Sequence, residues 1–222
     1  MIYFKIFLHL HLQNLLKMLT KEENIIIAAE KLFAEKGFNG TSTREISKAA
    51  NVNISMISYY FGSKEKLFEE IFKYRSNEGQ SFANHILENK EMNAWEKLSV
   101  MVEKYVDRVQ KYRDFFLMMQ RQQLAANNPF IEEFLKENKK KFVSMYFIAI
   151  EQGIQEGIFT KNPQVEFIHS TISGTLFTAI NSVKIYKEIM YGDENYENDY
   201  TEKLKLHLKN ILRYLLGYEE NK

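Results

Sequence analysis

The side chains best suited to molecular recognition lie close together in the chain, between Ser42 and Lys66. This stretch offers an arginine, several serines and tyrosines, and no acidic residue between Asn51 and Lys64. Arginine and lysine bind phosphate oxygens, and serine and tyrosine hydroxyls donate hydrogen bonds to the same oxygens. These residue types favour a surface that approaches a polyanion.

Two short helices joined by a turn are expected to position these side chains. Ser42 and Glu45 have the spacing of a capping box at the start of the first helix. Asn51 and Asn53 interrupt the pattern, because asparagine tolerates turn geometry and can cap a helix. The second helix, 54–61, would turn its apolar side chains at i, i+4 spacing inward and leave its serines outside. This arrangement predicts a helix-turn-helix, although an ordinary corner between two helices has the same geometry.

The same stretch resembles the DNA-binding signature of TetR-type transcriptional regulators. The matching residues are Thr43, Arg44, Ile46, Ala50, Val52, Ile57, Tyr59, Tyr60, Phe61, Ser63, Lys64 and Leu67. The resemblance covers roughly residues 20–70 and departs from the family at Ser58, where tyrosine is common, and at Ile54, where a polar or basic residue is common. It implies a DNA-binding domain, followed by a helical domain that binds an effector and dimerises through its last two helices.

Ten residues are predicted to contact DNA. Arg44, Tyr59 and Lys64 are expected to hold the duplex, and apolar side chains on the second helix can contact the thymine methyl group, which favours an A·T-rich, palindromic operator. The complete predicted set is Thr43, Arg44, Asn53, Ile54, Ser55, Met56, Ser58, Tyr59, Tyr60 and Lys64.

Composition predicts an all-α protein. Two prolines and nine glycines in 222 residues allow long uninterrupted helices, and no alternating strand pattern is present. The absence of cysteine fits a reducing cytoplasm. The net charge of +1 means that binding to DNA depends on where the cations lie rather than on bulk charge.

Apolar periodicity and breaks predict where the helices lie. A helix from Thr20 would end at Gly37, and a long one would begin at Lys64. The helix from Lys64 would end near residue 89. Further helices are predicted over 94–109, 112–126 and 129–155, from Asn162-Pro163 to about 191, and over 201–216. The acidic segment 192–199 is predicted to be a surface loop.

Three regions follow from this pattern: a leader, 1–19; a helix-turn-helix domain, 20–66; and a helical effector-binding and dimerisation domain, 67–222. The apolar leader is interpreted as an upstream extension of a chain that starts at Met18. A signal peptide, a helical arm and a membrane contact are the alternatives, and we expect no membrane association.

No catalytic or cofactor-binding pattern is present. The sequence has no cysteine, no G-x-S-x-G and no phosphate-binding glycine loop, and its histidines lack a partner at i+3 or i+4. We therefore expect neither an enzyme, nor a metal site, nor a cofactor.

The second domain is rich in aromatic and methionine residues, which form cores and also line ligand pockets. A small apolar or amphipathic effector is expected to contact Trp95, Tyr105, Phe115, Met119, Gln122, Tyr146, His169, Phe177 and Asn181. The sequence thus predicts a homodimeric, ligand-responsive regulator of transcription, more consistent with a repressor. The alternative is a helical ligand-binding protein without sequence-specific DNA binding.

Overall fold

The protein is built from α-helices. A computed structural model describes residues 20–125 and 128–219, with the side chains of all of these except 77–84 and 125. Within these residues every regular element is a helix, so the all-α prediction is confirmed. The leader predicted over 1–19 lies outside the described residues.

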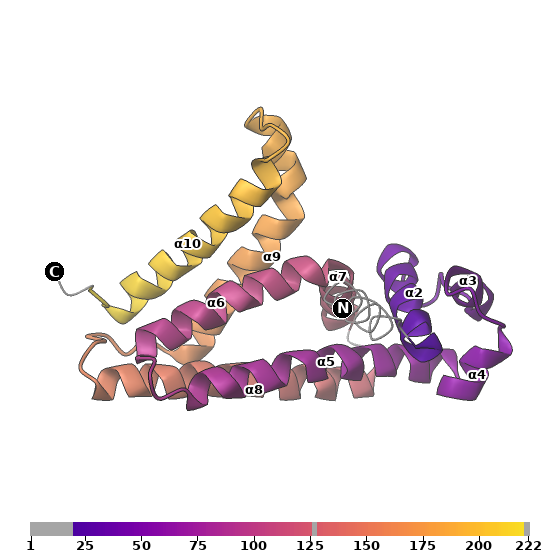
Figure 1. Cartoon of the computed structure of the whole chain (residues 1–222), viewed down its shortest axis with the longest axis horizontal. Helices are drawn as coiled ribbons and strands as arrows, with labels where there is room; N and C mark the ends of the chain where they lie inside the picture. The colour runs from indigo at the N-terminus through magenta and orange to yellow at the C-terminus, as the bar shows by residue number, and fades with distance from the viewer. Residues whose placement is uncertain (1–19, 126–127, 220–222) are drawn as a thin grey trace, which may run out of the picture.

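Three short helices form a compact unit at one end of the molecule (Figure 1): α2 (Lys21–Lys36), α3 (Thr43–Ala49) and α4 (Ser55–Phe61). Both predicted capping boxes are present, Thr20 with Glu23 and Ser42 with Glu45. Each box satisfies two backbone N–H groups that would otherwise lack partners, which sets where α2 and α3 begin.

The core of this unit depends on α5 (Lys64–Glu88). The rings of Phe33 and Phe38 lie 5.6 Å apart, and each lies 5.1 Å from the ring of Phe68, which belongs to α5. Figure 1 shows α5 continuing from this unit along the base of the molecule. One helix therefore belongs to both the small unit and the larger body.

The larger body contains α6 (Ala94–Lys111), α7 (Arg113–Ala125), α8 (Pro129–Gln155), α9 (Val165–Ile189) and α10 (Tyr196–Leu216). Phe72 of α5 connects to this body through Phe115 and Phe134, with ring centroids 5.4 and 5.2 Å away. A continuous apolar core thus joins α5 to α7 and α8.

The predicted start of α9 is wrong. Pro163 precedes the helix, which begins at Val165. The backbone N–H groups of Thr160 and Lys161 donate to the Leu216 carbonyl at 3.1 and 3.0 Å. This tertiary contact holds the connection against the end of α10, so the Asn-Pro start signal is overridden.

The acidic loop is shorter than predicted. The last helix, α10, begins at Tyr196 rather than at Thr201. The Tyr200 ring stacks against Tyr196 and Tyr186, with centroids 5.9 and 6.1 Å apart. Acidic residues in this first turn also favour a helix, because its N-terminus carries partial positive charge.

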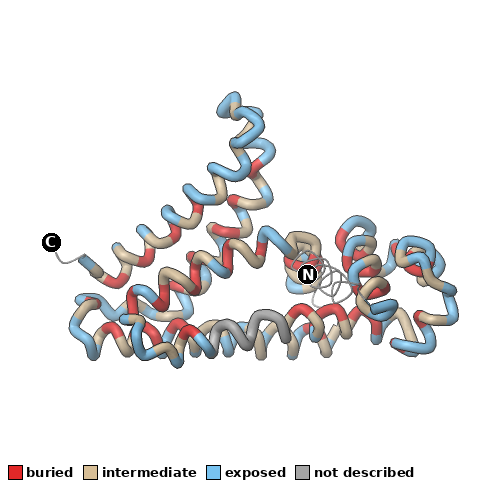
Figure 2. The backbone as a smooth tube through the Cα atoms, in the orientation of Figure 1, coloured by how far each residue is buried: buried red, intermediate tan, exposed pale blue. Residues whose placement is uncertain are grey.

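The α9–α10 hairpin projects from the rest of the molecule (Figure 1), and its outer half is largely exposed (Figure 2). Large apolar side chains are exposed near its tip, including Ile185, Ile189 and Met190. The body therefore carries an apolar surface that the described residues leave uncovered.

Candidate nucleic-acid interface and internal cavity

The turn between α3 and α4 has the geometry that the asparagines suggested. Asn51 adopts a left-handed conformation with φ of 53°. The Asn53 side-chain carbonyl accepts hydrogen bonds from the Ser55 backbone N–H at 2.9 Å and from its hydroxyl at 2.8 Å. The hydrogen bonds accepted by the Asn53 side chain thus close the turn and orient the start of α4.

The outer face of α4 is exposed. Ile57 and Phe61 are buried as predicted, whereas Tyr59 is 81% exposed and Ile54 47% exposed. Ser55 and Ser58 are also exposed. A short helix held by two buried anchors, with hydroxyl, aromatic and apolar side chains outward, suits entry into a major groove.

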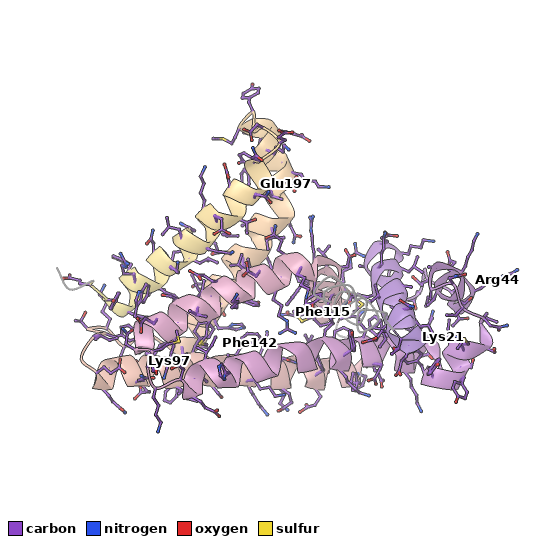
Figure 3. All side chains as sticks on the ribbon, viewed as in Figure 1. Lys21, Arg44, Lys97, Phe115, Phe142 and Glu197 are labelled. Atoms are coloured by element: carbon purple, nitrogen blue, oxygen red, sulfur yellow. The ribbon has the colours of Figure 1, made fainter. Side chains whose placement is uncertain are left out.

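Arg44 lies on α3 and is exposed at the same end of the molecule (Figure 3). Tyr60 is exposed as well, while Thr43 and Met56 are half-buried, and Met56 packs against the core. The ten predicted DNA-contact residues therefore all lie in the α3–α4 unit or at the start of α5. Base reading is predicted for Ile54, Ser55, Met56 and Ser58, and of these Met56 has the least free surface.

Lys64 has a structural role that the sequence did not reveal. Its ammonium donates to the carbonyls of Phe38 and Thr41, both at 3.0 Å, and lies 4.2 Å from the centre of the Phe38 ring. These contacts fasten the loop between α2 and α3 to the first turn of α5. A lysine ammonium has three N–H donors, and these two carbonyls take two of them. The predicted contact with a DNA phosphate therefore depends on the third N–H group.

Glu45 links α3 to α2. Its carboxylate accepts from Lys36 at 2.6 Å and from the backbone and hydroxyl of Ser42. The Lys36 ammonium and these Ser42 donors lower the pKa of Glu45 to about 2. Glu45 is therefore ionised at neutral pH and supports the cap of α3.

A cavity of about 430 Å³ lies in the larger body. This volume falls within the range of small-molecule sites. Its wall combines aromatic side chains with scattered polar groups from α5 to α9. The lining residues are Ser76, Tyr105, Arg108, Phe115, Phe116, Met119, Gln120, Gln123, Phe134, Leu135, Asn138, Lys139, Phe142, His169, Ser170, Ser173, Gly174, Phe177, Thr178 and Asn181.

Six of the nine predicted effector residues line this cavity: Tyr105, Phe115, Met119, His169, Phe177 and Asn181. They come from three helices, and Phe115 and Phe142 are labelled in Figure 3. The structure therefore brings together residues that are far apart in the sequence.

The other three predicted residues lie elsewhere. Trp95 stacks on Tyr218 with ring centroids 4.5 Å apart, which closes the core at the end of α10. Tyr146 is a buried core residue. Gln122 lines an adjacent, more open groove between α7 and α8. The aromatic character of a residue did not by itself distinguish a side chain that lines the cavity from one that packs in the hydrophobic core.

Sequence reasoning missed several polar residues of the wall, among them Arg108, Asn138 and Lys139. Arg108 follows Tyr105 by three positions, which places the two side chains on the same side of α6, and this spacing was the available signal. Asn138 lies across from Ser76, whose hydroxyl donates to its side chain at 3.3 Å.

His169 is the most distinctive polar group of the wall. Its ring stacks on Phe142 at a centroid distance of 5.6 Å, and its buried Nδ1 has no hydrogen-bond partner among the described residues. Burial lowers the pKa of His169, and the nearby Lys139 charge lowers it further. A neutral imidazole with an unsatisfied nitrogen can bond a ligand in the cavity.

Within the described residues, no group of acidic, histidine or cysteine side chains has a metal-binding arrangement, and no helix is long and apolar enough to cross a membrane.

Known proteins share both the helix-turn-helix and the helical body of this chain. Residues 25–71 match the family model described as bacterial regulatory proteins, tetR family. The chain is 26% identical over 205 residues to the "Probable HTH-type transcriptional regulator YttP" of Bacillus subtilis, covering 89% of this chain and 96% of that protein.

Solved structures share the fold over nearly the whole chain. The TetR family transcriptional regulator PfmR from Thermus thermophilus superposes with a TM-score of 0.66 and 18% identity, covering 92% of this chain and all of PfmR. The regulator FadR from Bacillus subtilis, solved in complex with stearoyl-CoA, superposes with a TM-score of 0.61 and 21% identity, covering 89% of this chain and 98% of FadR.

The matched helix-turn-helix, the near-full-length relative and the shared helical body agree: residues 25–71 match the tetR family model, and the chain as a whole is similar to HTH-type transcriptional regulators.

Proposed function

We propose that this protein is a homodimeric repressor that binds a palindromic operator and releases it when a small amphipathic effector enters the cavity. The exposed outer face of α4 beside Arg44 is the observation that carries the DNA-binding half of this proposal. Like other regulators of transcription, the protein would act in the cytoplasm on double-stranded DNA.

Two copies are needed to read two half-sites. A helix-turn-helix dimer places its recognition helices about 34–36 Å apart, one turn of the duplex. The apolar surface on α9 and α10 supports such a dimer, because a two-fold pair of hairpins would bury it symmetrically. The large exposed apolar side chains there are Phe167, Ile185, Tyr186, Ile189, Met190, Tyr191, Leu206 and Tyr214.

The cavity supports the effector half. Its aromatic wall and scattered polar groups suit an apolar or amphipathic small molecule, and the FadR structure with a similar fold holds an acyl thioester, stearoyl-CoA. Ser76 of α5 lines this cavity, and the first turn of the same helix fastens the helix-turn-helix through Lys64. A tilt of α5 would therefore change the position of both recognition helices.

In the proposed mechanism, the protein without effector binds the operator and represses transcription, and the effector weakens this binding. The effector needs only to bind the DNA-incompetent state better, and a coupling of about 1–3 kcal/mol would weaken DNA binding roughly 5- to 150-fold. Because the effector releases DNA, the DNA-bound state is the one without effector.

A mobility-shift assay with DNA upstream of the protein's own gene tests the DNA-binding half, with unrelated DNA as competitor. We expect a complex that survives excess competitor, and a binding selection that returns an inverted repeat rich in A·T under α4. Tyr59→Phe is expected to weaken binding to all sequences alike, since a hydroxyl–phosphate contact carries no sequence information. Loss of the complex at low competitor concentration would leave only non-specific binding and favour the ligand-binding alternative.

A further inference from the structure

The charged side chains of the cavity wall are all cationic among the described residues. Arg108 of α6 and Lys139 of α8 contribute positive charge, and no described lining residue is an aspartate or a glutamate. Arg108 is half-buried, whereas Lys139 is exposed at the edge of the cavity. A cationic wall beside aromatic rings selects a ligand that has both an anionic group and an apolar part.

Arg108 also contacts a second element. Its guanidinium donates a hydrogen bond to the backbone carbonyl of Arg75, in the middle of α5. Arg108 therefore stands between the cavity on one side and the long helix that carries the helix-turn-helix on the other. A ligand anion that draws this guanidinium toward itself competes with the Arg75 carbonyl.

Arg75 in turn connects α5 to α2. Its guanidinium pairs with the Glu30 carboxylate through two hydrogen bonds, Nε to Oε2 at 2.7 Å and a terminal nitrogen to Oε1 at 3.1 Å. Both side chains are 7% exposed, and the Arg75 guanidinium lies 4.2 Å from the centre of the Tyr112 ring. A buried, two-point ion pair is sensitive to small displacements, because removing one partner leaves a buried charge uncompensated.

We propose that the effector is an organic anion with an apolar tail, that Arg108 binds its anionic group, and that this contact acts on the DNA-binding unit through Arg75 and its pair with Glu30. The proposal rests on the function proposed above and adds the chemical class of the effector and the residue that senses it. The tail would lie against Phe115, Phe142 and Phe177, which line the same cavity.

The first experiment measures affinity for a matched set of ten-carbon probes by calorimetry below their micellar concentrations. Decanoate and decyl phosphate carry an anionic group, and decanol carries none. We expect the wild-type protein to bind at least one anion about tenfold or more tightly than decanol, as a charge-assisted hydrogen bond would produce. The comparison of decanoate with decyl phosphate then distinguishes a carboxylate from a phosphate head group.

The Arg108→Gln variant is expected to lose that preference while its affinity for decanol is unchanged. Lys104→Gln is the matched control, because Lys104 lies one turn earlier on α6 and is exposed. Equal binding of decanol and both anions by the wild type, or an unchanged preference in Arg108→Gln, would overturn the proposal. Neither result would affect operator binding by the ligand-free protein, so failure here is distinct from failure of the proposed function.

The second experiment follows the effect of the tighter anion on operator affinity. We expect the anion to weaken operator binding by the wild type, and to bind Glu30→Gln normally with a smaller effect on DNA. Glu35→Gln is the control on α2, because Glu35 is exposed. Glu30→Asp, which shortens the side chain by one methylene and so disrupts the two-point contact with Arg75 while keeping the charge, serves if thermal melting shows that Glu30→Gln does not fold. A full effect of the anion in the folded Glu30 variant would remove the Arg75–Glu30 pair from the coupling.

Discussion

At the scale of single residues, the position of His169 in the cavity wall changes its pKa. Burial and Lys139 lower its pKa, so the folded state resists protonation. The unfolded chain takes up this proton near the ordinary value of about 6.5. Stability supplied by the neutral ring is therefore complete above about pH 6.5 and is lost as the pH falls toward the folded-state pKa.

The corresponding prediction is a change in the pH dependence of unfolding. His169→Gln is expected to flatten the fall in the free energy of unfolding just below pH 6.5, measured by urea titration at several pH values. Lys139→Gln should raise the pKa of His169, followed by the NMR shifts of its ring. His207, exposed on α10, provides the control substitution. An identical pH profile for wild type and His169→Gln would show that the ring titrates normally.

At the scale of elements, Lys64 ties the loop between α2 and α3 to α5, in addition to the hydrogen bonds that the Thr41 hydroxyl donates to Leu32 and Gly37. Lys64→Met keeps most of the apolar stem and removes the donors to Phe38 and Thr41. A hydrogen bond from a charged group contributes about 1.5–3 kcal/mol to stability. We expect the free energy of unfolding to fall by about the contribution of one such bond, because local relaxation would offset part of the loss of the two. Thermal melting measures the loss, with exposed Lys66→Met as the control.

The same variant tests the predicted phosphate contact. Loss of one phosphate contact is expected to reduce the slope of log affinity against log salt concentration by about 0.9. A lower melting temperature with an unchanged slope would limit Lys64 to its structural role, and the phosphate contacts would then rest on Arg44 and Tyr59.

At the scale of the whole molecule, the α9–α10 hairpin is expected to form the dimer. Ile185 and Ile189 lie one turn apart on α9 and are 58% and 60% exposed. Replacing both with glutamate places like charges in a two-fold interface, so we expect a monomer by light scattering at micromolar concentration and a loss of cooperative operator binding. Leu124→Glu on α7 is the matched control, because Leu124 is exposed but lies outside the hairpin. A wild-type monomer, or a stable dimer of the double variant, would contradict this assignment.

Local sequence determined the helix-turn-helix. The capping boxes at Thr20 and Ser42, the left-handed Asn51 and the inward spacing of Ile57 and Phe61 depend on residues within a few positions of each other. The caps and the turn form between neighbouring residues, and the spacing of Ile57 and Phe61 specifies one face of α4, so residue type and spacing were sufficient to predict them. The core beneath that face still needs α5.

Tertiary structure alone decided which side chains line the cavity and how the helices of the body meet. Tyr146 is core and Tyr105 is wall, although both are aromatic residues on amphipathic helices. The contacts of Arg108 with Arg75 and of Lys64 with Thr41 join residues 33 and 23 positions apart. The starts of α9 and α10 likewise depend on contacts across the hairpin. Helical periodicity specifies which face of a helix is apolar, whereas the partner of that face is determined only when the helices pack.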